Sequence, residues 1–189
     1  NNKKTFEIIM LRSATNNIYK VCKQSAFTRN FGTAEKKGSI LSAWEKSCYH
    51  ELDFTINEEA TVYEAVERFA AYDIGALVAT NTKGELTGVI SERDYVKKVA
   101  LLGKVSKETK VKDIATRKAN VITASADESI ESSMEKMMTK SIRHLPIVDG
   151  ENLVGIVSIK DLIKEVKADR EKTIKDLSEM ALGKGGATF

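Results

Sequence analysis

Apolar residues follow the same order of spacings in two stretches of the chain. Each stretch opens with a short extended segment, Phe54–Ile56 in the first and Val121–Ala124 in the second. Apolar residues then recur every three or four positions, which predicts a helix with one buried face. We expect the three methionines of the second helix to lie in the core, because Met fills irregular gaps. The helical apolar positions are Val62, Val66, Phe69 and Ala70, then Ile130, Met134, Met137 and Met138.

Two apolar runs follow each predicted helix, and a tight turn joins them. This pattern predicts a β-hairpin, after which helical spacing returns. Each stretch therefore has the order strand, helix, strand, strand, helix, and we predict an α+β fold in which a βαββα unit occurs twice. The hairpin runs are Ile74–Thr80 with Leu86–Ile90, and Ile142–Val148 with Leu153–Val157; the closing helices contain Tyr95, Val96 and Val99, then Leu162, Ile163 and Val166.

The two stretches are copies of one unit. Copy one runs from about Phe54 to Leu102 and copy two from about Val121 to Lys167, with corresponding residues 68 positions apart before the hairpin turn and 67 after it. The missing residue falls at the hairpin tip, where a fold tolerates deletion. A unit of about fifty residues buries too little apolar surface alone, so the copies should pack together through their sheets.

Segments outside the copies complete the expected organisation. Ile40–Cys48 is predicted to form a short helix that packs on copy one, and Val111–Ala115 is its expected equivalent for copy two. Beyond Ala168 the charged sequence continues the last helix, with Ile174 and Leu177 on one side as a surface for a partner. The expected domains are a leader at 1–34, copy one with its linker helix at 35–106, copy two at 107–168, and a C-terminal helix and tail at 169–189.

Composition and charge narrow the class of protein. With 42% hydrophobic and 30% charged residues among 189, the chain has a globular composition, and its short apolar runs predict no membrane span. The net charge of +3 is uneven, because residues 1–34 hold six basic residues and one acid. The remainder is slightly acidic, so we do not expect the folded part to bind nucleic acid.

The basic leader has the composition of an organellar transit peptide. The chain opens with Asn1, and Met10 is the first plausible start. From Met10 to Ala34 there is no acid, and Arg, Lys and Ser alternate with spaced apolar residues. Arg29–Gly32 resembles a mitochondrial processing site. We therefore expect import into the mitochondrial matrix, with a disordered basic tail as the alternative.

The most specific motif ends each copy at the passage from strand to helix. Gly88–Asp94 and Gly155–Asp161 both consist of Gly, two apolar residues and Ser-x-x-Asp. Ser with an acid three residues later is close to a capping box, which only starts a helix. The same junction offers free amides and a hydroxyl to a phosphate, and its carboxylate could accept hydrogen bonds from a ribose diol. Both interpretations can hold together.

The duplicated unit with these motifs, and the run Ile142–Val148 before the second turn, resembles the cystathionine β-synthase (CBS) domain pair, or Bateman module. The resemblance covers about Ser39–Lys167. It implies that the copies pack with pseudo-two-fold symmetry and leave clefts for AMP, ADP, ATP or S-adenosylmethionine as a regulatory ligand, with no obligatory cofactor. It also implies a flat homodimer. Among CBS proteins, the chain is similar to plant organellar single-pair proteins of the CBSX type, described as regulators of thioredoxins.

The resemblance also implies roles for individual residues. Asp94 and Asp161 would hold ribose hydroxyls, and Ser91 and Ser158 would contact phosphate. Further contacts to phosphate would come from Arg93, Arg143 and His144, with Pro146 in the same run.

The two copies differ where these contacts are expected. Copy two has Arg143, His144 and Pro146, and the corresponding residues of copy one are Gly75, Ala76 and Val78. One cleft is therefore expected to bind phosphate better than the other, because a charge-assisted hydrogen bond contributes about 1.5–3 kcal/mol. Taken alone, His144 is more simply a partly buried histidine, and Pro146 indicates a strand edge or bulge.

Catalytic motifs are missing from the sequence. His50-Glu51 has no second histidine four residues on, and Leu102–Lys104 lacks the other residues of a phosphate-binding P-loop. Cys22 and Cys48 form no Cys-x-x-Cys pair. We therefore predict a non-enzymatic regulator that binds an adenosine-containing ligand and modulates a mitochondrial partner, either thioredoxin or a respiratory complex. The alternatives are an accessory subunit with degenerate clefts and a fragment of an enzyme.

Overall fold

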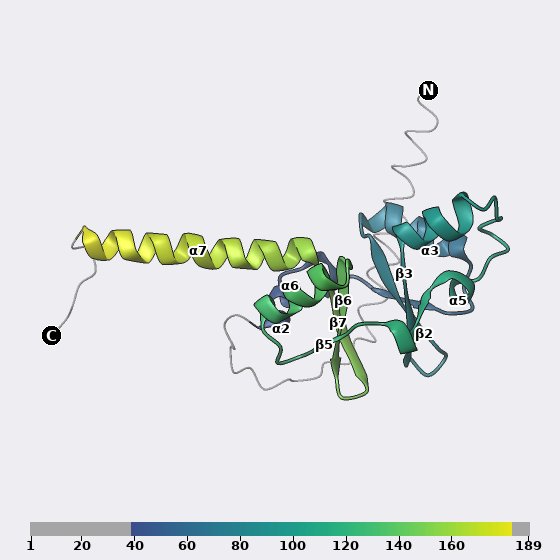
Figure 1. Ribbon diagram of the computed structural model, residues 1–189, viewed down its shortest axis with the longest axis horizontal. Helices are drawn as coiled ribbons and strands as arrows, with labels where there is room; N and C mark the ends of the chain where they lie inside the picture. The colour runs from purple at the N-terminus through teal and green to yellow at the C-terminus, as the bar shows by residue number, and fades with distance from the viewer. Residues whose placement is uncertain (1–38, 183–189) are drawn as a thin grey trace, which may run out of the picture. The chain divides into compact units, whose positions relative to one another are not determined.

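The computed structural model describes residues 39–182, all of which belong to one compact unit (Figure 1). The expectations for the leader at residues 1–34 and for the last seven residues lie outside the described residues. Within residues 39–182, the predicted βαββα order is confirmed in both copies.

Copy one forms a four-stranded sheet with the strand order β1-β2-β3-β4. Strand β1 is parallel to β2, and β2 and β3 form the predicted antiparallel hairpin. The elements are β1 (Thr55–Asn57), α3 (Val62–Tyr72), β2 (Ala76–Thr80), β3 (Leu86–Ser91) and α4 (Glu92–Tyr95), which continues as a π-helical turn, η2 (Val96–Ala100).

Copy two repeats this arrangement in a three-stranded sheet with the order β5-β6-β7. Both hairpins carry a register shift at the same place in the repeat, between Ala79 and Thr80 and between Ile147 and Val148. The elements are β5 (Ala124–Ser125), α6 (Ile130–Thr139), β6 (His144–Asp149), β7 (Asn152–Ser158) and α7 (Ile159–Ala181).

Each copy receives its linker helix from the segment that precedes the other copy. Helix α2 (Ile40–Glu45) places Ile40 and Ala43 in the core of copy two, and the Ile40 amide donates to the carbonyl of Glu128 at 2.9 Å. Helix α5 (Val111–Ile114) places both of its end residues in the core of copy one. The expected assignment of Ile40–Cys48 to copy one and Val111–Ala115 to copy two is therefore wrong for these helices, because their apolar faces are exchanged.

The rest of the second linker also crosses to the opposite sheet, whereas Tyr49 of the first linker lies in the core of copy one. The first linker continues as η1 (Cys48–His50), and the second as β4 (Thr116–Arg117) and η3 (Lys118–Asn120). Strand β4 pairs with β3 of copy one, where Gly88 lies opposite Arg117. The exchange ties the two copies into one unit.

Pro146 shortens the first strand of copy two. In copy one the amide of Val78 donates to the carbonyl of Phe54 at 2.8 Å, which starts the parallel pairing. Pro146 occupies the equivalent position and has no amide hydrogen. Strand β5 accordingly begins at Ala124, so the predicted segment Val121–Ala124 is correct only at its last residue. The proline also lies in the central strand of its sheet, buried, rather than at an edge.

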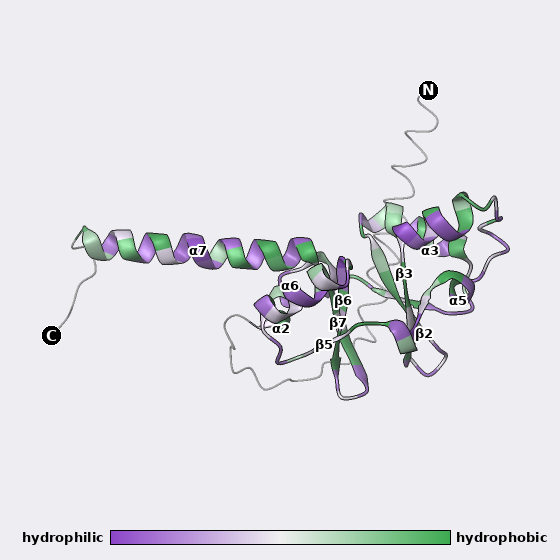
Figure 2. Ribbon diagram, viewed as in Figure 1, coloured by the Kyte–Doolittle hydropathy of each residue, from purple (hydrophilic) through white to green (hydrophobic). Residues whose placement is uncertain are grey.

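Helix α7 confirms the predicted extension beyond Ala168. Its first turns pack on copy two, where Leu162 is fully buried, and residues 170–182 are exposed. In the hydropathy view, apolar and polar residues alternate along its length (Figure 2). In α6, the expectation that all three methionines lie in the core is wrong, because Met137 is buried but Met138 is 74% exposed.

Candidate functional site

The two Ser-x-x-Asp motifs form matching capping boxes at the ends of β3 and β7. In copy one the Ser91 hydroxyl and amide donate to Asp94 Oδ2 at 2.6 and 3.1 Å, and the Asp94 amide donates back to Ser91 Oγ at 3.3 Å. In copy two the corresponding distances for Ser158 and Asp161 are 2.6, 2.9 and 3.3 Å. The capping interpretation is therefore confirmed in both copies.

The second carboxylate oxygen distinguishes the two junctions. Asp94 Oδ1 accepts an ion pair from Lys98 at 2.8 Å. The residue that corresponds to Lys98 in copy two is Glu165, and no cation within residues 39–182 pairs with Asp161. Asp161 is 6% exposed, whereas the side chain of Asp94 is 18% exposed. The copy-one junction is the more accessible, and the copy-two junction is the more deeply enclosed.

The segment η1 lies against the copy-two junction. Tyr49 is 2% exposed, and its ring meets that of His144 edge to face with 6.0 Å between centroids. Its hydroxyl faces the amides of Gly75 and Ala76 without a hydrogen bond of good geometry, and burial raises the pKa of Tyr49. Burial and then the negative charge of Asp161 raise the pKa of the neighbouring Cys48 thiol. A side chain of the first linker thus occupies space beside the second capping box.

The copy-one junction reaches the start of the second hairpin. A guanidinium nitrogen of Arg93 lies 3.4 Å from the carbonyl oxygen of Ser141, two residues before Arg143. Arg93 and Arg143 are both exposed. Arg93 of copy one thus reaches the backbone of copy two close in sequence to a second exposed cation, and the α4 N-terminus at the half-buried capping box of Ser91 favours negative charge.

His144 lies between the two junctions. A Cβ added to Gly75 would lie 3.0 Å from His144 Cε1 and 3.4 Å from a carboxylate oxygen of Glu92, so a side chain at this position would have to displace the imidazole by a few tenths of an ångström. Burial, and then the positive charge of Arg143, lower the pKa of His144 to about 4. At neutral pH the ring can donate a hydrogen bond to a ligand but supplies no charge.

The glycine of each motif is required by the exchanged linkers, which the sequence did not indicate. A Cβ on Gly155 would overlap the indole ring of Trp44, and a Cβ on Gly88 would lie 2.6 Å from the carbonyl oxygen of Thr116. Trp44 and Thr116 belong to the first and second linkers respectively. The first linker therefore packs directly on β7, the strand before the copy-two capping box. The second linker packs on β3, the strand before the copy-one capping box. The only sequence signal was the glycine itself.

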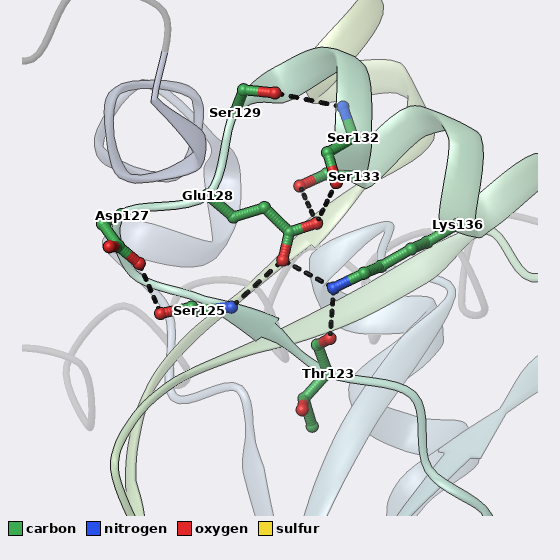
Figure 3. Close-up of polar contacts among 8 residues, drawn as sticks. All are labelled: Thr123, Ser125, Asp127, Glu128, Ser129, Ser132, Ser133 and Lys136. Carbon is green, nitrogen blue, oxygen red and sulfur yellow. Dashed lines mark hydrogen bonds and ion pairs between the residues drawn. The ribbon is translucent and has the colours of Figure 1, made fainter.

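A polar cluster before α6, also missed from the sequence, fixes the loop that receives α2 (Figure 3). Glu128 accepts hydrogen bonds from the Ser132 hydroxyl at 2.9 Å and the Ser125 amide at 3.3 Å, and pairs with Lys136 at 2.6 Å. Lys136 also donates to the carbonyl of Thr123. Burial opposes ionisation of Glu128, but Lys136 and Ser132 outweigh it and lower its pKa. This cluster is satisfied internally and serves structure.

Comparisons with known proteins agree with the repeat. The CBS domain family matches residues 51–101 and 111–168. The chain belongs to the CBS-domain family. It is 34% identical over 125 residues to the mitochondrial CBS domain-containing protein CBSX3 of Arabidopsis thaliana, covering 65% of this chain and 61% of that protein. A solved CBS-domain structure from Burkholderia ambifaria shares 33% identity with a TM-score of 0.63, covering 69% of this chain and 95% of that one.

A second relative is an enzyme that resembles this CBS pair over a minor part of its length. Inosine-5′-monophosphate dehydrogenase of Methanocaldococcus jannaschii is 35% identical over 133 residues, which cover 68% of this chain and 25% of that protein. The chain thus spans less than two thirds of these curated relatives. In residues 39–182 we find no helix suited to crossing a membrane and no cluster of three or more potential metal ligands.

The eight predicted site residues of this CBS pair divide into two groups and one separate residue. The first group belongs to the copy-one junction. It consists of Ser91, Arg93 and Asp94, with Arg143 two residues after the carbonyl that Arg93 reaches. Ser158, Asp161 and His144 lie beside Tyr49, and Pro146 is buried within β6. Two pockets of about 580 Å³, one beside the copy-one hairpin and one between α6 and α7, are lined by none of the eight.

Proposed function

We propose that this CBS pair is a non-catalytic regulator that binds an adenosine-containing ligand at the copy-one junction. One observation carries the proposal. The Arg93 guanidinium, two residues after Ser91 of the half-buried Ser91–Asp94 capping box, reaches the carbonyl of Ser141, two residues before Arg143 in the chain. A helix N-terminus with two cations suits a phosphate, and Asp94 could exchange its ion pair with Lys98 for ribose hydroxyls. AMP, ADP, ATP and S-adenosylmethionine share the adenosine group, and phosphate contacts favour the nucleotides.

Calorimetric titration of the full chain with AMP, ADP, ATP and S-adenosylmethionine tests this proposal. We expect binding of a nucleotide, and we expect Arg143→Ala to weaken it by about tenfold or more, because one charge-assisted contact contributes at least about 1.5 kcal/mol. Arg143 is exposed, so its replacement should leave the melting temperature unchanged. Lys172→Ala, an exposed cation on α7, is the matched control. Equal affinity in both variants would place the ligand elsewhere.

A structural accessory subunit is the second candidate, and the position of Tyr49 favours it. A buried ring packed against His144 is expected if the copy-two cleft holds no ligand. The absence of binding by every nucleotide at millimolar concentration, with the fold intact, would support this candidate over the sensor.

The mitochondrial location and the partner are also proposals. The similarity to a mitochondrial relative and the acid-free segment Met10–Ala34 support import into the matrix. Incubation of the full chain with isolated mitochondria should give a protease-protected, shortened product. Thioredoxin and a respiratory complex are the partners that the resemblance implies, and affinity capture from matrix extract with and without nucleotide would distinguish them. We further propose that the protein is a homodimer.

A further inference from the structure

Lys98 connects the copy-one capping box to the second linker. Its ammonium pairs with Asp94 Oδ1 at 2.8 Å and donates to the carbonyl oxygen of Ile114 at 2.5 Å. Asp94 belongs to the copy-one junction, and Ile114 is the last residue of α5, the linker helix that precedes copy two. One cation therefore holds together a carboxylate of the proposed ligand site and a backbone carbonyl of the linker.

The contact with Lys98 stabilises the end of α5. The last carbonyls of a helix have no partner inside the helix, and a cation beside them is favourable. Helix α5 has four residues, so it depends on contacts with the rest of the protein rather than on its own hydrogen bonds. Its last turn closes where the Ala115 amide donates to the carbonyl of Val111 at 2.8 Å. Lys98 is thus a tether that fixes this turn against copy one.

The equivalent position of copy two tethers the other linker. Glu165, which corresponds to Lys98, accepts a hydrogen bond from the Ser42 hydroxyl at 2.9 Å. It also accepts one from the ammonium of Lys46 at 2.5 Å, and both donors belong to the first linker. Within residues 39–182, however, no cation joins this tether to Asp161. Both copies therefore hold a linker from this position, and in copy one the tether also binds the aspartate of the capping box.

The backbone around Lys98 is irregular. Lys98 lies in the π-helical turn η2, where the Leu101 amide donates to the carbonyl of Val96 at 3.0 Å. At the same place in copy two, α7 continues as a regular α-helix. Single π-helical turns are frequent at functional sites. The irregular turn thus occurs in the copy whose tether reaches the capping box.

Lys98 can leave Asp94 at little cost. Its side chain is 41% exposed, so the released ammonium returns to water, and a partly exposed ion pair contributes little to stability. Asp94 Oδ2 already accepts hydrogen bonds from the hydroxyl and the amide of Ser91. Further donors must therefore bind at Oδ1, which Lys98 occupies. A ribose diol at Asp94 would compete with Lys98 for that oxygen.

We propose that Lys98 is a release switch, in which a ribose diol bound to Asp94 displaces the ammonium and frees the end of α5. This inference rests on the proposed binding of a nucleotide at the copy-one junction, and it adds how occupancy is transmitted to the linker between the copies. Linkage makes the effect reciprocal: a diol that loosens the linker binds more tightly when the linker is already loosened. A nucleotide without the diol does not release Lys98.

Hydrogen exchange of the full chain tests the release, with AMP, ADP, ATP and their 2′,3′-dideoxy forms as probes. At saturation, a nucleotide that binds should raise the exchange rate of the Ala115 amide about threefold or more, because α5 loses the contact at its end. The dideoxy form has the same base and phosphates but no ribose hydroxyls, so it should leave that rate unchanged. The Val78 amide, which donates to the carbonyl of Phe54 in the copy-one sheet, is the internal reference.

Lys98→Met removes the ammonium and keeps an unbranched side chain. We expect its Ala115 amide to exchange fast without nucleotide, and a bound nucleotide to cause no further increase. In calorimetry, the preference for the nucleotide over its dideoxy form should rise about threefold or more, since the diol no longer displaces a cation. A merely structural contact would leave this preference unchanged. Lys97→Met, which replaces an exposed neighbour, is the matched control and should behave as the wild type.

Three results would overturn the release switch while leaving the proposed sensor function in place. The first is a nucleotide that binds the wild type without faster exchange at Ala115. The second is unchanged Ala115 exchange in ligand-free Lys98→Met, which would show that the tether does not hold α5. The third is a weaker preference for the diol in that variant, which would mean that Lys98 positions Asp94 for the ligand. No binding by AMP, ADP or ATP would instead overturn the sensor function and this inference with it.

Discussion

His144 shows how one side chain links burial to pH. The corresponding residue of copy one is Ala76, so only copy two has an imidazole at this position of the repeat. The ring fills the space against Gly75 and Tyr49, and the same enclosure opposes its protonation. Of the cationic or donor contact to phosphate that the resemblance implied for His144, the lowered pKa leaves the donor at neutral pH.

We expect the folded protein to lose stability as the pH falls from about 6.5 towards 4. The pKa of His144 is lowered to about 4 by burial and by Arg143, whereas in the unfolded chain it lies near 6.5. Between these values the unfolded state binds a proton that the folded state does not, so up to about 3 kcal/mol of the free energy of unfolding is lost. Above pH 6.5 this contribution is fully present.

Urea denaturation between pH 4 and 8 measures the effect, with His144→Gln as the comparison. The variant keeps a side chain of similar size that does not titrate, so the difference between the two pH profiles should report His144 alone. Parallel profiles over this range would show that the ring has the same pKa in the folded and unfolded states and would contradict the lowered pKa.

Pro146 has no amide hydrogen to pair with the start of β5, so replacing it should lengthen that strand. In Pro146→Val the new amide could donate to the carbonyl of Ile122, as Val78 donates to Phe54 in copy one. We expect the free energy of unfolding to rise by about 0.5–1.5 kcal/mol, the contribution of one backbone hydrogen bond. Hydrogen exchange provides the measurement, since the residue-146 amide should exchange as slowly as that of Val78. Rapid exchange at that amide would mean that the strand is short for another reason.

The exchanged linker makes Gly155 intolerant of a side chain. Gly155→Ala would place a methyl group into the indole of Trp44 and should lower the free energy of unfolding by about 1–3 kcal/mol. In a double-mutant cycle with Trp44→Leu, the loss should be smaller than the sum of the single losses, because the smaller residue vacates the space. Additive losses in chemical denaturation would show that the two residues do not compete for it.

The predictability of each element follows from the range of the interactions that form it. Periodicity indicated α3, α6 and both hairpins, because a helix or hairpin is stabilised by neighbours in sequence. Periodicity could also identify α2 as amphipathic, since Ile40 and Ala43 lie on one face. It could not indicate which core that face would enter, because both cores are apolar and the choice depends on chain crossing. The capping role of Ser91 and Asp94 is local and was predictable, but the packing of Tyr49 against His144 was not.

At the scale of the whole molecule, the outer half of α7 is separate from the cores. Residues 173–182 are exposed, including Ile174, Leu177 and Met180. A chain that ends at Lys172 should therefore unfold within about 0.5 kcal/mol of the full chain at matched concentration. Leu162→Ala in the first turns is the contrast, with an expected loss of about 2–5 kcal/mol. If the shortened chain unfolds much more easily, the outer half contacts a second molecule.

The crossing of the linkers has a consequence for how the molecule could be divided. Cleavage of the exposed loop near Lys104 would leave one piece with copy one and α2, and another with α5 and copy two. Each piece would then hold a helix that completes the interior of the other and lack the one that completes its own. Separated, both halves should be poorly structured, yet on mixing they should recombine into a native-like complex, much as a split reporter regains its activity.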